Sequence, residues 1–112
     1  FCVADPLDPV AKGIELQILD TFGLAKPGHH DCGGIIRAMA ASKNMVKAPG
    51  EWNRYTLTLK ARHLTVDFNG ERTIVLDLDA SPMKDRPADG HIGFQDEAKH
   101  VWYRNVRIKE LK

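Results

Sequence analysis

The feature that most constrains the fold is a period-two alternation of apolar and polar residues across positions 55–78. Because successive side chains of a β-strand point to opposite faces, this alternation predicts a sheet with one buried face and one solvated face. Asn69 and Gly70 interrupt the pattern, and both residue types tolerate the positive φ angles of a type I′ turn. The sequence therefore predicts that Arg62–Phe68 and Arg72–Leu78 pair as neighbouring strands.

Helical periodicity is nearly absent from the rest of the chain. Residues 80–85 could form a helical turn, but Pro82 interrupts this stretch and Pro87 follows it. Seven segments have strand-like alternation or β-rich apolar runs between Gly, Pro, Asn and Asp residues. They are Gly13–Asp20, Gly34–Ala40, Tyr55–Lys60, Arg62–Phe68, Arg72–Leu78, His91–Asp96 and Val101–Leu111. Short strands at such spacing favour an all-β fold, an antiparallel β-sandwich or jelly roll.

Length and charge limit the classes of partner. A chain of 112 residues forms one domain, here residues 1–112, without room for a second core of ordinary size. The 16 Lys and Arg residues nearly balance the 15 Asp and Glu residues and are scattered, so no nucleic-acid partner is expected. No apolar run approaches the roughly 20 residues of a membrane-spanning helix, so we expect no membrane insertion. A neutral polar molecule is the better candidate partner.

The start of the chain resembles the middle of a domain. Phe1 is not an initiator methionine, and Phe1-Cys2-Val3 has the character of a strand end. We therefore expect an N-terminally truncated sandwich, whose unpaired sheet edges would favour self-association. Cys2 and Cys32 either form a disulfide or remain two buried free thiols, and the sequence leaves both alternatives open.

Glu15 and Gln17 fall on one face of the first predicted strand, with apolar residues on the other face. A bulge near Leu19 would bring Asp20 to the same face. The spacing is similar to the E-x-D-x-x-E strand of laminarinase-like glycosidases, except that Gln17 replaces one acid and Asp20 is shorter than another. Retaining glycosidases need two carboxyl groups about 5 to 5.5 Å apart, which this pattern does not establish. The alternative is that these residues are the solvated face of an antiparallel sheet.

The stretch 21–34 has no periodicity, which predicts a long surface loop. It contains His29 and His30, and imidazole can act as a general base or as a metal ligand. Together with Asp20 or Glu15, these histidines could form a mixed nitrogen and oxygen site for zinc or another divalent metal. The alternative is that they are solvated loop residues.

Two further residues could contact a ligand. Arg37 lies in the second predicted strand and could project into the cleft beside the first, or form an ion pair with a neighbouring acid. Gln95 shares a strand face with Gly93, which leaves room for a ligand, and its amide can donate to and accept from sugar hydroxyls. Trp52 and Trp102 are either stacking platforms for a pyranose ring or core residues.

Taken in order, several segments resemble the 3-keto-disaccharide hydrolase family, whose fold is a concanavalin-like jelly roll. The matching segments are GIELQILD, DCGGIIRA, PGEWNRYTLTLKARHLTVDFNGERT, RPADGHIGFQD and VWYRNVRIKEL. The resemblance covers nearly the whole chain but begins partway into the family's domain. Glu97 departs from the family, which often has His after the Gln-Asp pair.

The resemblance implies an exported, extracytoplasmic bacterial protein, with a signal peptide upstream of Phe1, that acts on glycosides whose C3 hydroxyl has been oxidised to a ketone. The ketone acidifies the C2 proton, so a base can remove it and the C1 substituent can leave, after which water can add. The rival interpretations are a non-catalytic carbohydrate-binding module and a structural adhesion domain.

Such chemistry needs a general base, stabilisation of the enediolate and polar groups that orient the ring. On this interpretation Glu15 and His30 are catalytic, as base or metal ligand. The expected substrate-binding residues are Gln17, Arg37 and Gln95, and the expected metal ligands are Asp20 and His29.

Overall fold

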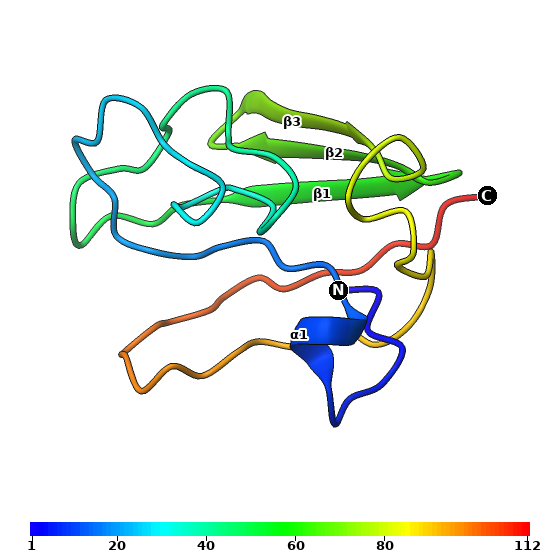
Figure 1. The fold of residues 1–112 in the computed structure, drawn as a ribbon. Helices are drawn as coiled ribbons and strands as arrows, with labels where there is room; N and C mark the ends of the chain where they lie inside the picture. Colours follow the sequence, from blue (N-terminus) through cyan, green and yellow to red (C-terminus); the bar gives the residue numbers. More distant parts are fainter.

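The computed structural model describes residues 1–112, and its regular sheet has three antiparallel strands in the order β1-β2-β3 (Figure 1). The strands are β1 (Tyr55–Lys60), β2 (His63–Phe68) and β3 (Glu71–Asp77). Asn69 and Gly70 connect β2 to β3 with φ angles of 49° and 87°. The predicted hairpin and the predominance of β structure are therefore confirmed.

A tight turn at Ala61 and Arg62 joins β1 to β2, and both residues have positive φ angles, 45° and 65°. Arg62 therefore belongs to the turn and not, as predicted, to the strand. Its guanidinium donates to the carboxylate of Asp79 and to the carbonyl oxygens of Lys84 and Arg86. The turn thus anchors the segment that follows β3.

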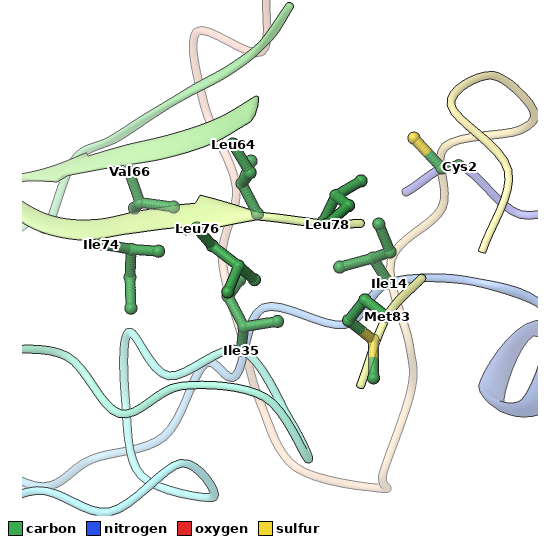
Figure 2. Packing of buried hydrophobic residues seen from close by; sticks show 9 residues of the cluster. All are labelled: Cys2, Ile14, Ile35, Leu64, Val66, Ile74, Leu76, Leu78 and Met83. Carbon is green, nitrogen blue, oxygen red and sulfur yellow. The ribbon is translucent and has the colours of Figure 1, made fainter. Parts of the chain in front are cut away.

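The hydrophobic core lies on one face of β2 and β3 (Figure 2). Every second residue of β2 is buried, as the alternation predicts. The cover comes from outside the sheet, from Ile14, Ile35 and Met83, each no more than 3% exposed. Nine buried residues form this cluster: Cys2, Ile14, Ile35, Leu64, Val66, Ile74, Leu76, Leu78 and Met83.

Four of the predicted strands are not regular strands in the structure: Gly13–Asp20, Gly34–Ala40, His91–Asp96 and Val101–Leu111. The first two keep a short antiparallel ladder, in which Leu16 pairs with Ile35. In the third, only His91 is bridged, to Val3. A strand requires a neighbouring chain for its N–H and C=O groups. Residues 92–112 make no backbone–backbone hydrogen bond and therefore form no strand.

A short helix, α1 (Pro9–Lys12), accounts for the helical structure of a chain in which helical periodicity is nearly absent. The Asp8 carboxylate accepts a hydrogen bond from the backbone N–H of Ala11 at 3.4 Å. Pro9 occupies the first helical turn, where its missing N–H has no intrahelical partner to lose. None of the helical structure has the length and apolar character that a membrane span requires.

Cys2 and Cys32 are both buried and both free. The disulfide alternative is therefore wrong, and two buried thiols are confirmed. Burial raises the pKa of the Cys2 thiol. The Cys32 sulfur lies 3.0 Å from the hydroxyl oxygen of Tyr55, with which it forms a hydrogen bond.

Much of the backbone lacks a backbone partner. The structure has 35 backbone–backbone hydrogen bonds, whereas a folded chain of this length has about 75 to 80. Residues 92–112 contribute none of them. This segment is extended (Figure 1) and is held by side-chain contacts, such as that between Phe94 and Tyr103, whose ring centroids are 4.1 Å apart.

The core can be tested at Phe68, which is fully buried and lies against the Tyr55 ring at 4.4 Å. We expect Phe68→Ala to lower the free energy of unfolding by about 3 to 5 kcal/mol, because it leaves a cavity. Val75, which is 66% exposed on the opposite face, provides the control, and Val75→Ala should change stability by less than about 0.5 kcal/mol. Urea denaturation measures both, and equal losses would contradict this assignment of the faces.

The unpaired backbone generates a second prediction. We expect the chain to self-associate through its open edges, because unpaired strands recruit other strands. Ile108 is 77% exposed in the unpaired segment, so Ile108→Lys should shift the chain toward monomer in analytical ultracentrifugation. Leu7→Lys, at a residue 95% exposed outside the sheet, should have no such effect. A wild-type chain that stays monomeric at high concentration would refute the prediction.

Candidate functional site

Glu15 and Gln17 lie half-buried on the short ladder that their segment forms with residues 33–36. The backbone N–H of Ile36 donates to the carbonyl oxygen of Glu15 at 3.1 Å. Ile14, next in the alternation, is 2% exposed and belongs to the core. Burial of Ile14 therefore leaves the two polar side chains on the other side of the segment, whereas Ile18, in the same apolar set, is 43% exposed.

Arg37 lies in a tight turn and not in the predicted strand. Ile35 pairs with Met39 around the turn, and Arg37 has a φ angle of 66°. Its side chain nevertheless lines the same small cavity as Glu15, together with Arg86. The volume of this cavity is about 10 Å³, which is room for about one water molecule. Arg37 takes part in none of the salt bridges of the structure.

His29 holds the turn that carries Arg37. The Nδ1 atom of His29 accepts a hydrogen bond from the backbone N–H of Arg37 at 3.0 Å. Its ring lies against that of His30, with centroids 4.3 Å apart. Gly34 permits this loop geometry, because a Cβ atom there would lie 2.5 Å from the His29 carbonyl oxygen. The positive φ angle of Arg37, which is not a glycine, is thus stabilised by its hydrogen bond to His29.

The structure does not assemble the expected metal ligands. The Asp20 carboxylate accepts from the backbone N–H of Phe22 at 3.2 Å, within its own loop. Asp20 lies outside the regular strands and lines the larger cleft described below, not the cavity of Glu15. No group of three or more His, Cys, Asp or Glu side chains is close enough to hold a metal ion. The residues present therefore do not fit a resident divalent metal.

Gln95 and His30 lie apart from Glu15. The Gln95 amide donates to the Glu97 carboxylate at 3.2 Å. Gln95 and His30 are both exposed, and neither lines the cavity of Glu15 or the larger cleft described next. Of the predicted site residues, Glu15 and Arg37 line one cavity, and Gln17 lies two residues further along the same ladder.

A larger cleft, with a volume of about 340 Å³, lies between residues 18–20, the loop 46–53 and Trp102. Tyr55 and Cys32, joined by their hydrogen bond, form part of its wall. Burial raises the pKa of the Tyr55 phenol, so the hydroxyl keeps its proton. Sequence reasoning singled out Trp102 but not the cleft, because the walls come from segments distant in the chain.

The role of His29 is testable with two substitutions. His29→Phe keeps a ring against His30 but removes the Nδ1 acceptor, so the turn at Arg37 should open more often. We expect faster amide hydrogen exchange at Arg37 and a free energy of unfolding lower by about 0.5 to 1.5 kcal/mol. His29→Asn retains an acceptor near the same position and should keep most of the protection. Unchanged exchange in the Phe variant would contradict the assignment.

Comparison with known proteins shows which proteins the chain is similar to. A search of curated proteins found no significant match. Among solved structures, the chain is similar to a protein of Parabacteroides distasonis ATCC 8503 provisionally named a glycosyl hydrolase, with 29% identity and a TM-score of 0.59. That similarity covers 69% of this chain and 41% of the other, so the chain spans less than half of that protein's length.

The family comparison covers nearly the whole chain. The matched residues are 3–109, and the family is described as the 3-keto-alpha-glucoside-1,2-lyase-like domain. The sequence resemblance is thereby confirmed over the same segments that suggested it. The protein belongs to the 3-keto-alpha-glucoside-1,2-lyase-like domain family.

Proposed function

We propose that this domain processes 3-keto-glycosides by removing the C2 proton, eliminating the C1 substituent and adding water, which amounts to hydrolysis. Family membership and the name of the similar structure support a carbohydrate substrate. The observation that carries the proposal is the position of Glu15, a half-buried residue that lines a small cavity together with Arg37 and Arg86.

The chemistry assigns a task to each of these groups. A base takes the C2 proton, and the electron pair moves toward the C3 ketone to form an enediolate. The pair then forms the C1–C2 double bond and expels the C1 substituent, whose oxygen takes up a proton. Glu15 is the base in this scheme, and water finally adds across the double bond.

The neighbours of Glu15 suit the same scheme. A guanidinium beside the reacting centre stabilises the negative charge that develops on the C3 oxygen, a task that falls to Arg37. Gln17 shares a face of the ladder with Glu15, and its amide can hold ring hydroxyls. The roles of His30 as base and Gln95 as substrate ligand stay predictions, because neither side chain lies beside Glu15 in this structure.

We also infer that the three-stranded sheet is one layer of a concanavalin-like sandwich. The ladder between residues 15–17 and 33–36, which covers the core opposite β2 and β3, supports this architecture. Export from the cytoplasm stays a prediction from the family resemblance.

A non-catalytic sugar-binding module is the second candidate function. It is favoured by the 340 Å³ cleft, which is lined by Trp102 with 73% of its surface exposed. Turnover of a 3-keto-glucoside by the protein would exclude this alternative, whereas saturable sugar binding without turnover would select it.

The catalytic assignment is tested by Glu15→Gln, which keeps the shape of the side chain and removes its basicity. We expect kcat on a 3-keto-glucoside to fall by about 10² to 10⁴, the range of general acid–base catalysis, with an unchanged melting temperature. The matched control is Glu71→Gln, in an exposed residue that lines neither cavity, which should keep full activity. The assay uses the whole protein that the gene encodes.

A substrate with deuterium at C2 provides a second readout. The wild type should turn it over more slowly if removal of the C2 proton limits the rate. Full activity of Glu15→Gln would mean that Glu15 is a solvated residue and not the base.

A further inference from the structure

The two cavities differ in what they can enclose. The cavity at Glu15, about 10 Å³, does not enclose a sugar ring, whereas the cleft beside Trp102, about 340 Å³, falls within the range of about 300 to 1,000 Å³ found for small-molecule sites. The cleft begins at Ile18, three residues after Glu15, which is about 10 Å along an extended chain. The larger cleft can therefore hold a sugar ring near the proposed base, whereas the cavity at the base cannot.

The lining of the cleft is amphipathic. Ile18 and Leu19 are 43% and 46% exposed and form an apolar part of the wall. Lys47 and Glu51 add charged groups of opposite sign, and Asn53 adds a neutral amide. An apolar partner would remove the charged groups from water without pairing them, which is costly. A pyranose ring, with apolar C–H faces and a rim of hydroxyls, matches both parts of the lining.

Trp102 has the exposure of a stacking platform. It is 73% exposed, which contradicts the alternative that it is a core residue. The ring of His100 stacks near it, with centroids 6.1 Å apart and an angle of 27° between the planes. Trp52 differs, because the guanidinium of Arg104 lies 4.0 Å from the centroid of its ring, and it does not line the cleft. Trp102 is therefore the indole available to a ligand in the cleft.

One polar side chain of the cleft, that of Asn53, is held in place before any ligand binds. The side-chain oxygen of Asn53 accepts from the backbone N–H of Lys47 at 3.0 Å and from the amide of Asn69 at 2.8 Å. Those bonds orient the Asn53 amide, and the bond between Tyr55 and Cys32 fixes another part of the wall. Groups already fixed lose little entropy on binding.

The geometry points to the cleft beside Trp102 as a binding site for the ring of an α-glucoside, in which the indole of Trp102 stacks on the ring and Asn53 and Glu51 bind its hydroxyls. The choice of an α-glucoside rests on the proposed function, whereas the site itself rests on the shape and lining of the cleft.

Because the chain has two tryptophans, the fluorescence of variants that keep one of them can report ligand binding in the cleft. In Trp52→Phe the fluorescence comes from Trp102, and in Trp102→Phe it comes from Trp52. Titration with methyl α-D-glucopyranoside and with its 3-keto form should give a saturable change in the first variant and none in the second. Glucitol, which has similar hydroxyls but no ring, should give no change in either.

Affinity measured by calorimetry completes the test. Trp102→Ala should weaken binding of the glucoside by about tenfold, and Trp52→Ala should leave the affinity unchanged. Thermal melting checks that each variant is folded, and the whole encoded protein is used throughout. Equal affinity in Trp102→Ala and wild type would overturn the inference.

Different experimental results would contradict the proposed function and the proposed binding site. If the cleft binds the glucoside but no 3-keto-glycoside is turned over, the proposed function is wrong and the binding site stands. If Trp102→Ala turns over the 3-keto substrate with an unchanged KM, the inference about the cleft is wrong and the function stands.

Discussion

The apolar face of β2 and β3 must be kept from water, and the chain offers no second regular strand layer to cover it. The cover comes from Ile14, Ile35 and Met83, which belong to three segments without regular structure. Apolar burial is not directional, so it does not by itself fix where such segments lie. Directional hydrogen bonds from two arginines hold these segments in position. Arg62 donates to the segment after β3, and Arg86 donates to the Gly13 carbonyl oxygen at 2.9 Å.

The need to bury the apolar face of β2 and β3 also determines the position of the candidate site. Because Ile14 enters the core, the alternation leaves Glu15 and Gln17 on the side away from it. The apolar set of that segment extends beyond the core, and Ile18 lines the cleft instead of being buried. One extended segment thus places a carboxylate at one cavity and an apolar wall at another. Its position relative to the sheet determines both.

Features encoded by neighbouring residues could be predicted from the sequence. The strand pattern of β2 and the turn at Asn69-Gly70 depend on contacts between residues close in the chain, and both are confirmed. The cap of α1 had the same local character, since Asp8 and Pro9 are a helix-start signal, but four residues are too few to show helical periodicity. The Cys32–Tyr55 bond and the free state of both thiols could not be predicted, because they depend on contacts between distant segments.

Positions that break local rules were the hardest to predict. The run that contains Arg37 alternates like a strand, and nothing local signals that this residue adopts a left-handed conformation. The contact with His29 that stabilises it comes from a residue eight positions away. The segment 92–112 has the composition of strands, but pairing depends on a neighbouring chain that no local pattern identifies. Glu15 was predictable as a surface residue of its segment, whereas its proximity to Arg86 was not.

The hydrogen bonds of Arg62 and Arg86 also connect parts of the chain that are far apart in sequence. The Arg62 guanidinium meets the carbonyl oxygens of Lys84 and Arg86 across 22 and 24 positions of the chain, a stretch that contains β2 and β3. Arg86 in turn can hold Gly13 only when its own segment is in place. Because the short loops of the hairpins close at little entropic cost, we expect the long loop back to Gly13 to close last. A ribosome that releases this chain from its N-terminus would therefore expose Glu15 and its neighbours, unfolded, until residues synthesised much later arrive to dock them.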